Sequence, residues 1–219
     1  MRIDRTTLLR TKPRILAQGA TNQIADACIE DVQTHFTQLH EDVKSMEAHL
    51  TAPLNQDIAN RMKWAFGDDS WATAKKVKAH VITMRKVIER AASLTVTYSS
   101  VLGDNPNVYA HVYPHNLNPM MAGSLFIYMD WRYTIKEEDE LDNRYLTLVH
   151  EFSHLACKTK DYQYVPKWSA AQQLAGNRGQ CIGPYAAEDF DVDKAVDNAD
   201  SYGYFFAATF ARAGGCTHP

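Results

Sequence analysis

The stretch "LVHEFSHLACKTKDYQYV", residues 148 to 165, determines how the rest of the chain is interpreted. It places His150 and His154 four positions apart, with Glu151 directly after the first histidine and Asp161 seven positions after the second. Side chains four apart lie one turn above each other on a helix, so both imidazoles can face a single cation. The stretch therefore predicts a metal-binding helix, followed by a turn that brings an acidic third ligand.

Hydrophobic periodicity supports a helix in this region. His150 and His154 share a face with Asn143 and Thr147, apart from the apolar stripe of the same segment. That stripe consists of Leu141, Tyr145, Leu148, Phe152 and Leu155. A helix anchored to a core by one face gives metal ligands the rigid support that they need.

Zinc suits this set of side chains. Catalytic zinc sites take three ligands from the protein and keep a fourth position open for water, which one ion bound by His150, His154 and Asp161 would satisfy. Glu151 is not itself a ligand and would act as general base, taking a proton from the metal-activated water and passing it to the leaving amine. The expected chemistry is the hydrolysis of an amide bond.

The remaining sequence predicts one α+β domain in which helices dominate. Helices are expected at 22–50, from Ile58 to a break at Gly67, at 71–91, at 137–156, and near 166–175 and 192–212. Short segments rich in β-branched and aromatic residues predict strands at 94–100, 107–114 and 124–131. We expect residues 1–20 to form an N-terminal tail and residues 21–219 to form the domain.

Composition and charge exclude several classes of partner. With 219 residues, of which 45% are hydrophobic and 22% charged, the chain is typical of a globular protein with a sizeable core. A net charge of -3 gives no general electrostatic reason to bind nucleic acid or an anionic membrane surface. No run approaches the roughly 20 apolar residues of a membrane span. Neither partner is therefore expected, and the sequence does not fix the oligomeric state.

The cysteines and the N-terminal segment bear on the compartment. Four widely spaced cysteines, Cys28, Cys157, Cys181 and Cys216, contain no C-x-x-C pair and form no predicted zinc site. Two disulfides and four free thiols are both compatible with this number. No apolar stretch of the kind found in a classical signal peptide follows the basic first residues. The chain is expected to be secreted or delivered by another route, to stay in the cytoplasm, or to be a fragment whose signal was removed.

The segments "HEFSH" and "KTKDYQYV" resemble the H-E-x-x-H and G-T-x-D-x-x-Y-G signatures of the aspzincin metallopeptidases, a family of deuterolysins and fungal peptidyl-Lys metalloendopeptidases. Three further segments are similar to that family and occur in its order: "WAFGDDSWATAKKVKAHV", "VYAHVYPHNLN" and "DNADSYGYFF". The similarity spans roughly residues 60–206, with a weaker helical match from about residue 22. The resemblance implies a zincin-like fold, mostly helical, with a small sheet and an active-site helix.

The same resemblance implies a role for each residue of the motif. It makes His150, His154 and Asp161 the ligands of one zinc ion and Glu151 the general base and acid. It also makes Tyr164 the support of the oxyanion in the tetrahedral intermediate. A phenol close to a ligand is a suitable O–H donor for such an oxyanion, and the alternative is an ordinary packing aromatic.

Departures from the family pattern concern the turn and the substrate subsite. Lys158 and Val165 stand where the signature has glycines, so the turn that carries Asp161 is expected to differ in backbone conformation. Asp200 occupies the aspartate of the N-A-D segment, which in Lys-specific members helps to hold a substrate lysine just after the scissile bond. Gly203 stands where those members have a second acidic residue. We therefore expect at most a preference for basic residues at that subsite.

The sequence thus predicts a zinc-dependent endopeptidase that acts on an extended polypeptide. A bacterial toxin or effector delivered into a target cell is one role that suits a small peptidase without a signal peptide. A zinc amidohydrolase acting on a small or cell-wall amide would use the same chemistry and stays an alternative. A binding protein that keeps the scaffold without turnover is another, although it would not need Glu151.

Overall fold

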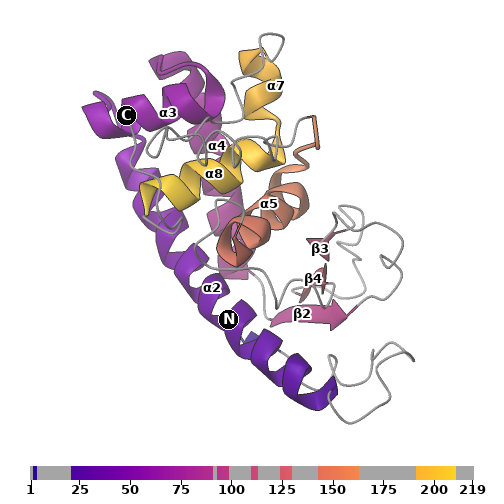
Figure 1. Cartoon of the computed structure of the whole chain (residues 1–219). Helices are drawn as coiled ribbons and strands as arrows, with labels where there is room; N and C mark the ends of the chain where they lie inside the picture. Colours follow the sequence, from indigo (N-terminus) through magenta and orange to yellow (C-terminus); the bar gives the residue numbers. More distant parts are fainter. Residues whose placement is uncertain are drawn as a thin grey trace, which may run out of the picture.

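The computed structural model describes residues 2–3, 21–90, 93–98, 110–112, 124–129, 143–162 and 191–210, with side chains for 34–89, 110, 112, 143–162 and 191–210. The described part is mostly helical, as the sequence predicts. Its helices are α2 (Thr21–His49), α3 (Gln56–Phe66), α4 (Trp71–Arg90), α5 (Arg144–Cys157), α7 (Val192–Val196) and α8 (Ala199–Thr209). In Figure 1, α3, α4, α7 and α8 gather near the C-terminal end of the long helix α2, and α5 lies beside α8.

Local signals in the sequence set both ends of α3 and the beginning of α4. Asn55 precedes α3, and its Oδ1 accepts a hydrogen bond from Ile58 N at 2.8 Å. Gly67 ends that helix with a φ of 75°, a left-handed conformation that glycine adopts without strain. Ser70 then begins α4 by accepting a hydrogen bond from Thr73 N at 3.3 Å. The predicted break at Gly67 is confirmed.

Four short strands pair in the order β1-β2-β4-β3. They are β1 (Arg2–Ile3), β2 (Ser93–Tyr98), β3 (Ala110–His111) and β4 (Ser124–Met129). Strand β2 pairs in parallel with β1 and β4, whereas β3 runs antiparallel to β4. In Figure 1, β2, β3 and β4 lie together toward the N-terminal end of α2. Strand β1 falls within the segment expected to be a tail, and the domain boundaries stay a prediction.

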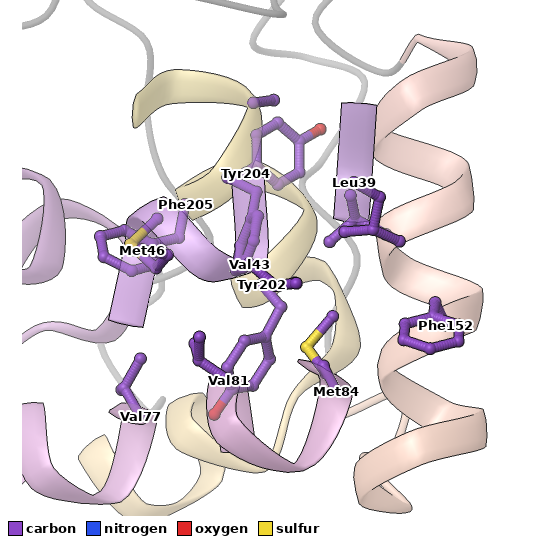
Figure 2. Close-up of a cluster of buried hydrophobic side chains, with 14 of the residues drawn as sticks. Leu39, Val43, Met46, Val77, Val81, Met84, Phe152, Tyr202, Tyr204 and Phe205 are labelled. Atoms are coloured by element: carbon purple, nitrogen blue, oxygen red, sulfur yellow. The ribbon is translucent and has the colours of Figure 1, made fainter. Parts of the chain in front are cut away.

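An apolar core between α2, α4, α5 and α8 holds the helices together. Figure 2 shows this cluster, to which the four helices contribute Leu39, Val43, Met46, Val77, Val81, Met84, Phe152, Tyr202, Tyr204 and Phe205. Phe36 and Phe152 join α2 to α5 with an edge-to-face contact of 5.5 Å between ring centroids. Each large apolar side chain buried in this way contributes about 1.5–3 kcal/mol, so α5 is firmly anchored.

Helix α5 begins later than the sequence predicts and is buried on every side. Asn143 has extended φ and ψ angles of -89° and 177°, and its Oδ1 accepts a hydrogen bond from Leu146 N at 2.9 Å. The helix therefore starts at Arg144 rather than at residue 137, which corrects that boundary. All residues from Tyr145 to Leu155 are buried, because α8 and α4 pack on faces that the apolar stripe leaves free. The polar face is thus an internal one.

The helix predicted at 192–212 is interrupted, which corrects that prediction. Helix α7 ends at Val196 and α8 begins at Ala199, with Asp197 and Asn198 between them. At this junction the Lys160 N–H donates to Asp197 O at 2.8 Å, and the Ala199 N–H donates to Lys160 O at 3.0 Å. Main-chain groups that a continuous helix would pair internally are therefore satisfied by the segment that follows α5.

Two further expectations concern a helix near 166–175 and membrane-spanning segments. The helix predicted near 166–175 lies outside the described residues. Within the ranges that the structure describes, no helix combines the length and the apolar character that crossing a lipid bilayer requires.

Candidate metal centre

Three of the predicted site residues converge at the C-terminal end of α5. His150 and His154 lie on consecutive turns of the helix, and Asp161 belongs to the segment that follows it. The two Nε2 atoms are 3.1 Å apart. Asp161 Oδ1 lies 3.1 Å from Nε2 of His150 and 3.0 Å from Nε2 of His154. These three side chains are therefore positioned as possible ligands of one metal ion.

The second nitrogen of each imidazole fixes its tautomer. His150 Nδ1 lies 2.6 Å from Asp200 Oδ1, and His154 Nδ1 lies 2.6 Å from the carbonyl oxygen of Thr159. Because a carbonyl or an ionised carboxylate only accepts hydrogen bonds, each Nδ1 must be the donor. In the neutral imidazoles both Nε2 atoms then direct lone pairs toward each other and toward Asp161.

The donor set fits zinc in number, kind and spacing. Three lone pairs at about van der Waals contact repel one another unless a positive charge lies between them. A tetrahedral zinc ion with bonds of about 2.0–2.1 Å separates neighbouring ligand atoms by about 3.3 Å, close to the distances found here. Two imidazole nitrogens and one carboxylate oxygen leave the fourth position open, which is the pattern of catalytic zinc sites.

The electrostatics of the centre also favour a cation. Burial alone would lower the pKa of His150 and His154, but the hydrogen bonds with Asp161 and the charges of the nearby carboxylates together outweigh it and raise both pKa values. Asp200 raises the pKa of His150 further, to well above the ordinary value. Burial would raise the pKa of Asp161, yet the two histidines hold it below its ordinary range. The centre therefore favours a bound positive charge, and protons compete with a metal ion for the same ligand atoms.

Glu151 is buried next to the ligands without belonging to the metal-binding group. Burial raises the pKa of this carboxyl, and the charges of His150 and His154 oppose the increase. The carboxylates of Asp161 and Asp200 add to it. A carboxyl group with a raised pKa, close to the ligands, has the character that proton transfer near neutral pH requires.

Asp200 lies at the centre rather than at a distance from it. It stands in the first turn of α8, its residue exposure is 6%, and its Oδ1 contacts His150. A carboxylate that accepts the Nδ1 hydrogen orients the imidazole and makes Nε2 a stronger ligand. The family resemblance implies that Asp200 holds a substrate lysine, and that role stays a prediction beside this second one.

Gly203 explains why α8 carries no companion acidic residue at that position. A Cβ atom built on Gly203 would lie 2.9 Å from Leu146 Cγ and 3.2 Å from the Leu146 carbonyl oxygen. Helices α5 and α8 thus approach so closely that a side chain at this position meets backbone. An acidic side chain at this position would require Leu146 and the facing backbone to shift.

We expect Gly203→Ala to lower the free energy of unfolding by about 1 kcal/mol. Overpacking costs about 1–3 kcal/mol, while alanine in a helix recovers about 0.5–1 kcal/mol relative to glycine. Urea unfolding followed by circular dichroism measures the difference, and Gly203→Glu should lose more. An alanine variant as stable as the parent would mean that Leu146 moves aside at no cost.

The turn after α5 uses a lysine where the family signature has glycine. Lys158 adopts φ and ψ angles of 61° and 31°, and its N–H donates to His154 O at 3.0 Å. This is the left-handed conformation that glycine favours, so the expected change of backbone conformation does not occur at Lys158. Val165, the other departure, lies outside the described residues.

Three residues that hold the centre were not predicted from the sequence. Thr159 is buried, its carbonyl holds His154, and its Oγ1 lies 2.7 Å from Ser153 Oγ. Ser153 Oγ in turn donates to His150 O at 2.8 Å, so a hydroxyl chain joins the turn to the helix. Asn198 accepts a hydrogen bond from the residue after Asp161. In the sequence, the threonine of the T-x-D pattern and the asparagine of the N-A-D segment could have indicated Thr159 and Asn198.

Two other predicted features have different outcomes. Tyr164, the predicted oxyanion donor, lies outside the described residues. Cys157 carries a free thiol whose pKa burial raises to about 12, and its Sγ lies 3.4 Å from the His80 carbonyl oxygen. Within the part of the chain that the structure describes, Cys157 is unpaired and takes no part in the metal-binding group.

Comparisons with known proteins agree with this metal centre. A family model described as aspzincin, lysine-specific metallo-endopeptidase, matches residues 52–207. Among solved structures, a zinc peptidase from Grifola frondosa has a similar fold, with a TM-score of 0.52. It shares 24% sequence identity, and the match covers 81% of this chain and 92% of that chain. No curated protein sequence matches significantly.

The fold and the centre define a metallohydrolase built around a histidine-bearing helix. The chain belongs to the aspzincin family, because the family model covers well over half of its length. It is a zinc-dependent metalloendopeptidase, a hydrolase that acts on polypeptides.

Proposed function

We propose that this metalloendopeptidase binds one zinc ion through His150, His154 and Asp161 and uses Glu151 as general base. The observation that supports this proposal is the convergence of three lone pairs at mutual distances of 3.0–3.1 Å, with both Nδ1 atoms committed elsewhere. Zinc bound there would polarise the carbonyl of the scissile bond and make a water molecule a better nucleophile.

The residues of the chain then carry the proton. Glu151 takes a proton from the attacking water as the C–O bond forms, which makes its carboxyl neutral. It passes that proton to the amide nitrogen as the C–N bond breaks, so the amine leaves neutral and Glu151 is ionised again. Tyr164 is proposed as the O–H donor to the oxyanion, on the resemblance alone.

We propose a weak preference for substrates with lysine directly after the scissile bond. The matching family is described as lysine-specific, which supports such a preference. However, Asp200 Oδ1 is engaged by His150, and a side chain at Gly203 would press against Leu146. One shared carboxylate selects an ammonium group less strongly than two. Secretion, and delivery as an effector, stay proposals that fractionation of producing cells and culture medium would test.

The test of the proposed function is cleavage of a denatured protein, with every new N-terminus identified by mass spectrometry. We expect cuts that disappear with a zinc chelator and return when zinc is restored, with lysine modestly enriched directly after the cut. A folded, zinc-loaded protein that makes no cuts would contradict an endopeptidase acting on general polypeptides. Release of product from small amides only would favour the amidohydrolase.

A further inference from the structure

The residues on either side of Asp161 are held to the junction of α7 and α8. On one side, Lys160 forms two main-chain hydrogen bonds, one to Asp197 O at 2.8 Å and one from Ala199 N at 3.0 Å. On the other side, the main-chain N–H of Tyr162 donates to Asn198 Oδ1 at 3.0 Å. Hydrogen bonds to a single short segment therefore bracket the acidic ligand.

The third of these bonds depends on one side chain. Main-chain bonds survive most substitutions, whereas the bond to Tyr162 N requires the side-chain oxygen of Asn198. Asn198 is completely buried, with an exposure of 0%, and its Nδ2 donates to Ser201 Oγ at 3.3 Å. The main-chain N–H of Tyr162 can only donate, so the amide oxygen must face Tyr162, and Nδ2 then faces Ser201.

Asp161 needs such support more than the histidines do. The side chains of His150 and His154 are 9% and 11% exposed and belong to a packed helix, whereas that of Asp161 is 41% exposed and follows the helix end. A ligand on an exposed turn loses conformational freedom when it binds metal, unless the fold has already ordered it. The same junction also carries Asp200, which holds His150.

We propose that Asn198 is a positioning residue for the third zinc ligand: it holds the main chain beside Asp161 and so fixes that carboxylate relative to the two histidines. The inference rests on the proposed role of Asp161 as a ligand. Asn198 acts through the backbone of residues 160–162, because its side-chain oxygen accepts a hydrogen bond from Tyr162 N.

The first test is zinc affinity, measured by competition with a chelating dye of known affinity. We expect Asn198→Ala to weaken zinc binding about 10–100-fold, the range typical of residues that orient ligands. Ser201→Ala is the matched control, because it removes only the partner of Asn198 Nδ2 and leaves the bond to Tyr162 N. Circular dichroism of both variants shows that they are folded. If Asn198→Ala does not fold, Asn198→Ser provides a smaller polar change with the same expected direction.

A double-mutant cycle separates positioning from general destabilisation. If Asn198 acts through Asp161, then Asn198→Ala should cause no further loss of zinc affinity in a chain that already carries Asp161→Ala. An equal loss in both backgrounds would overturn the proposal and leave Asn198 a purely structural role. Unchanged affinity in Asn198→Ala alone would also overturn it, while leaving the metal ligands intact. Unchanged affinity in Asp161→Ala would overturn both the ligand set and this inference.

Discussion

Glu151→Gln is expected to reduce the rate of peptide hydrolysis about 10²–10⁴-fold while zinc remains bound. Glutamine has nearly the same size and keeps a carbonyl oxygen, but its amide cannot accept and return a proton. Because Glu151 lies outside the metal-binding group, its loss should leave zinc affinity within a few-fold of the parent. Steady-state kinetics on a fluorogenic peptide, together with the zinc content of the same sample, measure both effects.

A buried carboxylate elsewhere provides the control. Asp42 is 4% exposed and accepts a hydrogen bond from Tyr145 Oη at 2.6 Å, on the side of α5 that faces α2. Asp42→Asn removes a buried negative charge without touching the proton path, so its hydrolysis rate should stay close to that of the parent. Similar losses of rate in the two variants would mean that Glu151 matters for folding rather than for proton transfer.

The helices were predictable because their signals are local. The apolar spacing of α2 and the glycine after α3 act within a few residues of one another. In the same way, two histidines one turn apart are brought together by any helix that contains them. These features need no knowledge of the rest of the chain.

The surroundings of the metal centre depend on contacts between distant segments. The break between α7 and α8 arises because Lys160 pairs with residues nearly forty positions later, and no window of the sequence near Asn198 contains that information. The position of Asp200 beside His150 depends equally on how α8 crosses α5. Periodicity therefore predicted one helix at 192–212, and the resemblance assigned Asp200 to substrate alone.

Asp200→Ala is expected to weaken zinc binding about 10–100-fold, because His150 loses the acceptor that orients it. Asp200→Asn should fall between this variant and the parent, since its amide oxygen still accepts from Nδ1 but carries no negative charge. Competition with a chelating dye at fixed pH gives both affinities. Asp193→Asn removes one charge from an exposed side chain on α7 and should leave zinc affinity unchanged.

The same variants separate the two roles of Asp200. A purely orienting residue changes zinc affinity in Asp200→Asn but leaves the preference for lysine after the cut as it was in the zinc-loaded enzyme. A residue that only holds the substrate does the opposite, because its loss lowers kcat/KM for lysine substrates and leaves zinc affinity unchanged. A carboxylate has two oxygens, and Oδ1 is the one that contacts His150. Losses in both measurements would therefore mean that Oδ1 serves the ligand while Oδ2 serves the substrate.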